Sequence, residues 1–193
     1  MFSKRSLTRL ILGAAALAFV AGADASASAY GKGGDFTLEG PDGPVSLHDL
    51  RGKVVLIFFG YTSCPDVCPI SLARIDACFS QMNDDELERV RALFITLDPE
   101  RDTPDRLEKY TGYFHPNIIG LRDDVGGIDV VTSMYGVEYS KDAMPDSALG
   151  YSISHPTDIL VLDTNGRIVD AMPHNTSAGV LLARIRDLLN ASD

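Results

Sequence analysis

Two cysteines four residues apart are the most reactive feature of this 193-residue sequence. Cys64 and Cys68 enclose Pro-Asp-Val, directly after a run of apolar residues and at the expected start of a helix. Amide groups at a helix N-terminus are unpaired and carry partial positive charge, so they lower the pKa of a nearby thiol. The thiolate is both the nucleophile and the metal ligand. The position of the pair therefore predicts redox chemistry or metal binding.

The spacing of the pair bears on that choice. Many dithiol oxidoreductases carry two residues between their cysteines, whereas here there are three. Residues four apart on a helix have Cβ atoms roughly 5–6 Å apart, and a disulfide needs about 3.8 Å. A metal ion bridging two sulfurs tolerates the wider gap, and soft thiolates select Cu(I), zinc or iron–sulfur clusters. Two thiolates are too few for tetrahedral zinc, so further ligands decide the metal. A plain structural disulfide is the alternative.

The elements that must position this pair alternate along the chain. Residues 53–61 and 92–97 predict strands buried on both faces, because they are mostly apolar. Helices are expected to begin at Pro69 and at Pro104 (with Thr103 as its N-cap), and to cover residues 128–135 and 178–189. Residues 36–47 predict an N-terminal β-hairpin, 118–121 a short strand, and 159–169 a second hairpin that turns at Asn165-Gly166. This order predicts an α/β, thioredoxin-like fold with a central mixed sheet and helices on both faces.

His155 is the candidate third ligand among four histidines. In thioredoxin-like folds a proline just before this hairpin, usually cis, lies against the cysteine loop. Pro156 fits that place, so we expect His155 to face Cys64 and Cys68. One imidazole with two thiolates gives a three-coordinate site that suits copper in either oxidation state. The alternative is a hydrogen-bonded histidine with no ligand role, which is the commoner use of a lone histidine. The left-over Cys78 is predicted to be a buried apolar residue.

The first 29 residues have the pattern of an export signal. Lys4, Arg5 and Arg9 precede an apolar run over residues 10–20, and small residues at 25–29 offer peptidase sites. The run is shorter than the about 20 residues of a spanning helix. We predict cleavage before Tyr30 or Ser28, with an uncleaved membrane anchor as the alternative. Residues 30–193 are then one domain, exported to the periplasm.

The charge of the chain limits its partners. The net charge is −10, and loss of residues 1–29, which hold three basic residues and one acidic residue, leaves a domain near −12. Without clustered Lys and Arg the domain is not expected to bind nucleic acid. Its acidity permits steering toward a basic partner face.

Several motifs resemble one family. Residues 60–69 (Gly-Tyr-Thr-Ser-Cys-Pro-Asp-Val-Cys-Pro) resemble the Sco/SenC family of copper proteins. Residues 96–104 (Thr-Leu-Asp-Pro-Glu-Arg-Asp-Thr-Pro) resemble that family's second signature, and residues 114–121 a third stretch. His155 occupies the family's histidine position. The likeness runs from about Phe36 to Leu189, although Pro156 directly after the histidine departs from the commoner pattern.

The resemblance implies a metallochaperone. One copper ion, Cu(I) or Cu(II), would be held by Cys64, Cys68 and His155 and used to assemble the dinuclear copper centre of cytochrome c oxidase. The implied partner is the copper-bearing subunit of the oxidase or another copper protein. The resemblance also implies that Asp98 and Asp102 help with copper handling or partner docking, against the alternative of helix capping and loop solvation.

A thiol–disulfide reductase is the competing function. Cys64 and Cys68 would then be a redox-active pair that keeps the cysteines of a copper-receiving protein reduced. His155 separates the two functions, because a copper site needs it and a reductase does not.

Overall fold

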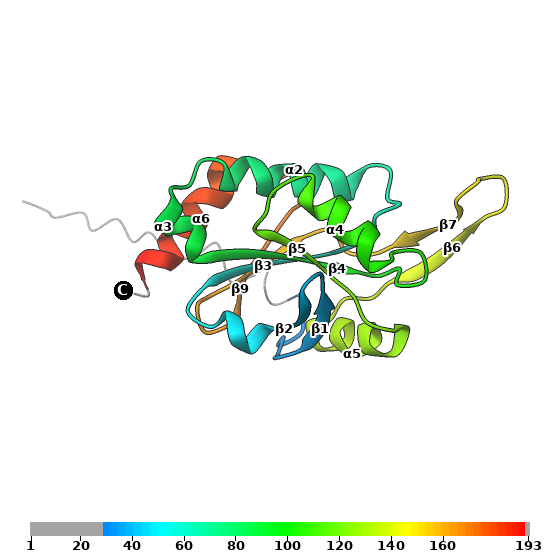
Figure 1. The fold of residues 1–193 in the computed structure, drawn as a ribbon, viewed down its shortest axis with the longest axis horizontal. Helices are drawn as coiled ribbons and strands as arrows, with labels where there is room; N and C mark the ends of the chain where they lie inside the picture. Colours follow the sequence, from blue (N-terminus) through cyan, green and yellow to red (C-terminus); the bar gives the residue numbers. More distant parts are fainter. Residues whose placement is uncertain (1–28, 192–193) are drawn as a thin grey trace, which may run out of the picture.

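A five-stranded mixed sheet forms the centre of the molecule (Figure 1). The computed structural model describes residues 29–191, so the predicted export signal lies almost wholly outside the described residues. The strand order is β5-β4-β3-β8-β9. The strands are β3 (Val54–Gly60), β4 (Val90–Thr96), β5 (Ile118–Leu121), β8 (Ile159–Leu162) and β9 (Ile168–Met172). β3, β4 and β5 are parallel, whereas β8 is antiparallel to β3 and to β9.

Helices cover both faces of this sheet, which confirms the thioredoxin-like α/β fold (Figure 1). The helices α2 (Val67–Phe79), α4 (Pro104–Gly112) and α6 (Ala178–Asn190) lie on one face. The opposite face carries α5 (Val125–Tyr135) and the predicted N-terminal hairpin of β1 (Thr37–Gly40) and β2 (Gly43–Ser46). A short 3-10 helix, η1 (Leu47–Leu50), follows β2, and α3 (Asp84–Glu88) precedes β4. Every residue of β3 is buried, as expected of a strand between two layers.

Local sequence signals set several element ends. The Thr103 side chain accepts a hydrogen bond from the Arg106 amide at 3.3 Å, and Pro104 is the first residue of α4, as predicted. α5 ends at Gly136, whose φ of 66° suits a residue without a Cβ. α2 begins at Val67 rather than at Pro69, so the proline lies in the first turn, where no amide partner is needed.

One hairpin has no counterpart in the sequence patterns. β6 (Ser140–Met144) and β7 (Gly150–Ser154) pair with each other and extend from one end of the molecule (Figure 1). All five residues of β6 are exposed, so the strand shows no alternation of apolar and polar residues. The hairpin leads directly into His155, and its attachment therefore bears on the site.

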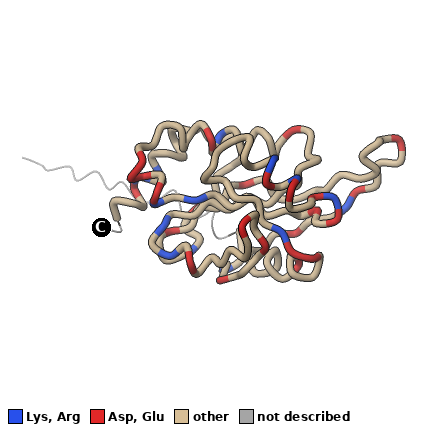
Figure 2. The backbone as a smooth tube through the Cα atoms, in the orientation of Figure 1, with Lys and Arg blue, Asp and Glu red and all other residues tan. Residues whose placement is uncertain are grey.

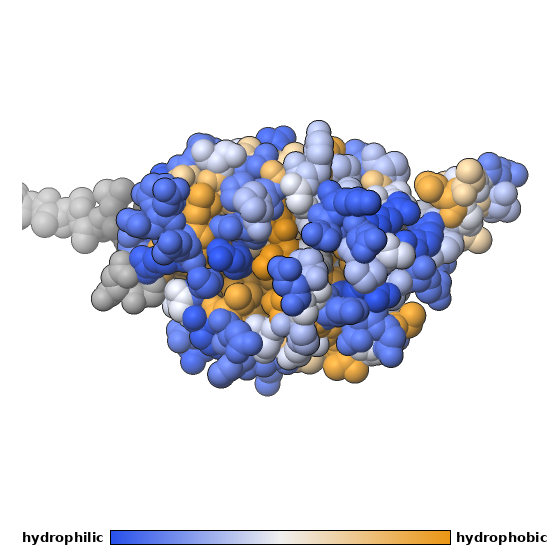
Figure 3. All heavy atoms as spheres, in the orientation of Figure 1, coloured by the Kyte–Doolittle hydropathy of each residue, from blue (hydrophilic) through white to orange (hydrophobic). Residues whose placement is uncertain are grey.

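The surface agrees with the charge analysis. Lys and Arg are interspersed with Asp and Glu along the backbone and do not gather in one stripe (Figure 2). Apolar side chains reach the surface between the two layers on the face shown in Figure 3. Within residues 29–191, no helix is long and apolar enough to cross a membrane.

Candidate metal centre

The cysteine pair lies where β3 ends and α2 begins. The chain turns after Tyr61, with the Cys64 amide donating to the Tyr61 carbonyl at 3.2 Å. Cys64 is half-buried and Cys68 is buried, and both are free thiols, as is the fully buried Cys78. A Cβ at Gly60 would lie 2.9 Å from the Cys68 sulfur. The last residue of β3 must therefore be glycine for the sulfur to take this place.

The two sulfurs share one proton. The Cys68 thiol donates a hydrogen bond to Cys64, and this bond lowers the pKa of Cys64 from 9.0 to about 5. The backbone amides of Asp66 and Cys68 also donate to the Cys64 sulfur, as expected at a helix start. The same S–H···S bond, together with burial and the charge on Cys64, raises the pKa of Cys68. The resting pair is therefore a thiolate on Cys64 held by a thiol on Cys68.

This contact was not expected from ideal helical spacing. Cys64 precedes α2, so the loop curls and brings its sulfur back to Cys68. The geometry therefore suits a bridging metal and also leaves disulfide formation within reach.

Tyr61 joins the cysteines to His155. Its backbone amide donates to the Cys68 sulfur, and its hydroxyl is hydrogen-bonded to Cys64. The same hydroxyl accepts the Ile153 amide of β7 at 3.4 Å. The rings of Tyr61 and His155 meet edge to face, with centroids 6.2 Å apart.

His155 lies just beyond the end of β7 and is half-buried. Its Nδ1 is 2.8 Å from the Pro156 carbonyl oxygen, a contact that makes Nδ1 the donor and leaves Nε2 available. Burial lowers the pKa of His155, so the ring is neutral, the form that a metal ligand requires. The His155–Pro156 peptide bond is trans rather than cis, as are all peptide bonds in the described residues.

An open hollow of about 510 Å³ borders the half-buried His155. It is lined by Glu138, Tyr139, Ser140, Ser154, His155 and Pro156. Within residues 29–191, no three His, Cys, Asp or Glu side chains are gathered closely enough to hold one metal ion. The fold thus brings His155 toward the cysteine pair through Tyr61 but does not assemble the three predicted ligands into a closed site.

Asp98 and Asp102 are both fully buried. Asp102 accepts hydrogen bonds from the Thr62 amide at 2.9 Å and the Thr96 hydroxyl at 2.7 Å, and also from the Thr62 hydroxyl. It therefore ties the cysteine loop to the end of β4. Asp98 accepts the Tyr151 hydroxyl at 2.6 Å and pairs with Arg101. Both carboxylates are thus occupied by partners within the chain, which favours a positioning role over direct copper handling.

Arg101 is a positioning residue to which sequence reasoning assigned no role. Its guanidinium stacks on the Tyr151 ring at 3.7 Å and donates to the carbonyls of Leu149 at 2.9 Å and Tyr151 at 3.1 Å. It also donates to Asp98. These contacts fasten the β6–β7 hairpin to the loop after β4, and so help to place His155. The only signal in the sequence is the position of Arg101 within residues 96–104.

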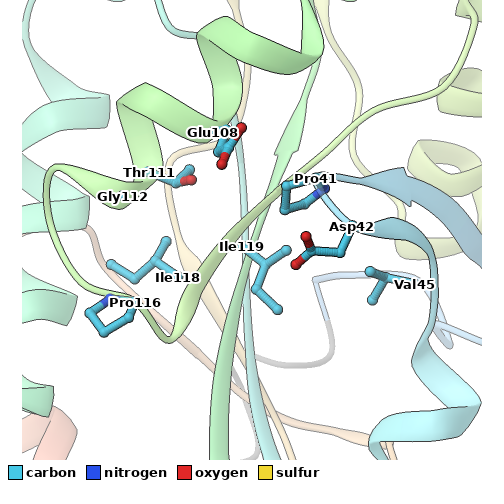
Figure 4. A pocket seen from close by; sticks show the side chains of 9 residues that line it. All are labelled: Pro41, Asp42, Val45, Glu108, Thr111, Gly112, Pro116, Ile118 and Ile119. Atoms are coloured by element: carbon cyan, nitrogen blue, oxygen red, sulfur yellow. The ribbon is translucent and has the colours of Figure 1, made fainter.

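A second hollow lies away from the cysteines, at the edge strand β5 (Figure 4). It measures about 250 Å³ and is lined by Pro41, Asp42, Val45, Glu108, Thr111, Gly112, Pro116, Ile118 and Ile119. No cysteine or histidine lines it, so it offers no soft ligand for copper.

Comparison with known proteins identifies the family. The family model described as SCO1/SenC matches residues 24–190. The chain belongs to the SCO1/SenC family. Among its relatives, the mitochondrial protein SCO2 of Saccharomyces cerevisiae is 35% identical over 169 residues, which are 84% of this chain and 56% of the yeast protein. An SCO2-like protein of Rickettsia conorii is 38% identical over 136 residues, 70% of this chain and 66% of that protein.

A solved structure of the SCO1/SenC family has the same fold. Bradyrhizobium japonicum ScoI, determined with copper bound, is 37% identical and superposes with a TM-score of 0.75. The match covers 82% of this chain and 99% of that chain. The present chain spans 56–66% of the length of the yeast and rickettsial relatives.

Proposed function

We propose that this protein is a copper metallochaperone that carries one copper ion on Cys64, Cys68 and His155. The observation that carries the proposal is the position of Cys64 and Cys68 at the start of α2, next to Tyr61, whose ring meets that of His155 while the His155 Nδ1 contacts the Pro156 carbonyl and leaves Nε2 available. Two soft thiolates together with one imidazole suit copper. Membership of the SCO1/SenC family and the likeness to copper-bound ScoI support the same metal.

Copper binding requires a small closure of the site. The Cys68 proton must leave, because a metal binds the thiolate. His155 must also approach the sulfurs, and it lies at the end of a hairpin held by side-chain contacts rather than within the central sheet. A half-buried imidazole at the edge of an open hollow suits a ligand that is engaged and released during transfer.

The receiving partner in this proposal is a copper protein, with the copper-bearing subunit of cytochrome c oxidase as the first candidate. The family resemblance supports this partner. We also propose that the chain acts after export, in the periplasm, either free or held by its N-terminal segment. The acidic surface favours a basic partner face.

Replacement of His155 tests the metal site. His155→Ala should lower Cu(I) affinity by more than about 100-fold, or about 2.7 kcal/mol, measured anaerobically by competition with a chelator. His48→Ala is the matched control, because the His48 side chain is 74% exposed and distant in sequence from the site. Equal copper affinity in His155→Ala and the wild type would refute the three-ligand site.

A thiol–disulfide reductase is the second candidate, favoured by the S–H···S contact. The Cys64 thiolate would attack a partner disulfide, and Cys68 would then displace the partner, leaving a Cys64–Cys68 disulfide and a reduced partner dithiol. A thiol reductant must regenerate the pair. A measured reduction potential below about −300 mV would mark a disulfide that thiol reductants cannot reopen, and would exclude turnover as a reductase.

A further inference from the structure

Tyr110 carries a buried hydroxyl that the proposed site does not use. Its ring, on α4, packs against the rings of Phe94 and Phe114 at centroid distances of 5.5 and 5.6 Å. The hydroxyl oxygen is buried and has no hydrogen-bond partner among the described residues. A buried, unpaired polar group costs free energy, and native proteins contain few of them. The position of this hydroxyl therefore calls for a physical reason.

The ring of Tyr110 packs on the same side of β3 as the Cys68 sulfur. A Cβ at Gly60 would meet the Phe94 ring at 2.8 Å and the Cys68 sulfur at 2.9 Å, so both flank the same point of β3. Tyr110 packs on that same Phe94 ring. Burial raises the pKa of Tyr110. Tyr110 therefore keeps its proton and remains an O–H donor.

The reduced pair does not need this donor, but a copper-bound pair would. At rest, the Cys68 thiol donates a hydrogen bond to Cys64. Among the described residues, its sulfur accepts one hydrogen bond, from the Tyr61 amide. When both sulfurs bind copper, the S–H···S bond is lost and Cys68 becomes a buried thiolate near the Asp102 carboxylate. Cys64 then keeps two backbone amide donors, from Asp66 and Cys68, whereas Cys68 keeps one. A further donor would stabilise the Cys68 thiolate.

We propose that Tyr110 is a positioning residue of the copper centre, whose hydroxyl donates to the Cys68 sulfur when copper is bound. The inference rests on the proposed function of Cys64, Cys68 and His155. Hydrogen bonds to metal ligands commonly tune affinity and electronic structure. The unpaired hydroxyl in the reduced protein is then a donor held ready for the loaded state.

Tyr110→Phe tests this proposal because it removes only the hydroxyl. Anaerobic competition should show about 10- to 100-fold weaker Cu(I) binding, the size expected for one hydrogen bond to a charged group. Tyr113→Phe is the matched control, since Tyr113 follows α4 closely and is 84% exposed. The control should bind copper as the wild type does.

Two further readouts separate positioning from a structural role. Removal of an unpaired buried hydroxyl should leave the Tm of the copper-free protein unchanged or higher, while the rise in Tm on copper loading becomes smaller. A structural role would lower both Tm values. The sulfur-to-Cu(II) charge-transfer band should also shift in Tyr110→Phe and not in Tyr113→Phe.

The outcomes distinguish this inference from the function on which it rests. Copper-binding wild-type protein with unchanged affinity and spectrum in Tyr110→Phe would overturn the role of Tyr110 alone. Wild-type protein that fails to bind copper would overturn both. If Tyr110→Phe does not fold, ¹³C-tyrosine spectra of the wild type decide the matter: Cu(I) loading should shift the Tyr110 Cζ resonance and leave that of Tyr113 in place. An unmoved Tyr110 resonance would refute the proposal.

Discussion

Asp102 offers the sharpest test of whether a buried carboxylate positions the cysteine loop or handles copper itself. The side chain is fully buried. Three donors converge on it: the amide and hydroxyl of Thr62, two residues before Cys64, and the hydroxyl of Thr96 at the end of β4. Asp102→Ala removes the acceptor for all three, whereas Asp102→Asn keeps one oxygen in place.

The two substitutions should differ greatly in stability. Each buried donor left unpaired costs about 1–3 kcal/mol, and partial rearrangement of the two hydroxyls lowers the sum for Asp102→Ala to about 3–5 kcal/mol, the range typical of breaking a buried charged network. In Asp102→Asn, the retained oxygen can accept the Thr62 amide and the Thr96 hydroxyl. The Thr62 hydroxyl can rotate to accept from the new amide group, so the loss should be about 1 kcal/mol.

Urea unfolding and Cu(I) competition together provide the assay. Asp102→Ala should unfold at much lower urea, and Asp102→Asn should unfold near the wild type. Copper affinity of Asp102→Asn should stay within about threefold of the wild type or rise, because the charge on Asp102 raises the pKa of Cys68 and so opposes thiolate formation. Asp105→Ala, at an exposed position in the first turn of α4, is the control.

The opposite pattern would refute this reasoning. An Asp102→Asn variant of normal stability that cannot bind copper would show that the carboxylate charge itself takes part. An Asp102→Ala variant as stable as the wild type would show that the three hydrogen bonds do not hold the loop.

Three further predictions concern the rest of the site. Cys64 should react with iodoacetamide with a midpoint near pH 5, because its thiolate fraction falls only as the pH drops through its pKa. Cys68→Ala removes the main hydrogen-bond donor to Cys64 and should raise that midpoint. An unchanged midpoint would contradict the shared proton. Gly60→Ala should displace the Cys68 sulfur and cost about 1–3 kcal/mol in urea unfolding, whereas full stability would show that the strand can shift. Arg101→Lys keeps the charge but not the forked contacts with the carbonyls of Leu149 and Tyr151. Limited proteolysis should therefore cut the β6–β7 hairpin faster, and copper should bind more weakly. Cutting at the wild-type rate would show that Arg101 does not anchor the hairpin.

Contiguous apolar runs made much of the fold predictable. Residues 53–61 and 92–97 contain β3 and most of β4, because a strand buried on both faces must be apolar along its whole length. Residues that favour turns or helix ends also marked element ends correctly, namely Gly136 after α5 and the Asn165-Gly166 pair between β8 and β9. The chemistry of the cysteine pair was also predictable, since it depends on a local feature, the helix start.

The β6–β7 hairpin escaped prediction for a physical reason. Its strands bury little, so they lack the periodic pattern that burial imposes. The hairpin is held instead by Arg101 and Asp98, whose partners lie about 50 residues further along the chain. Contacts of this kind leave no periodic trace in either segment.

The sequence by itself determined the reactive cysteine pair, its place at a strand-to-helix junction, and the family motifs around it. Only the tertiary structure decided that Asp102 holds the cysteine loop, that Tyr61 connects Cys64 to the hairpin before His155, and that the Tyr110 hydroxyl is buried without a hydrogen-bond partner among the described residues. The reason is that these relations depend on side chains meeting across the sheet from distant parts of the chain. Spacing along the sequence encodes local geometry, whereas hydrogen-bond partners are chosen by packing.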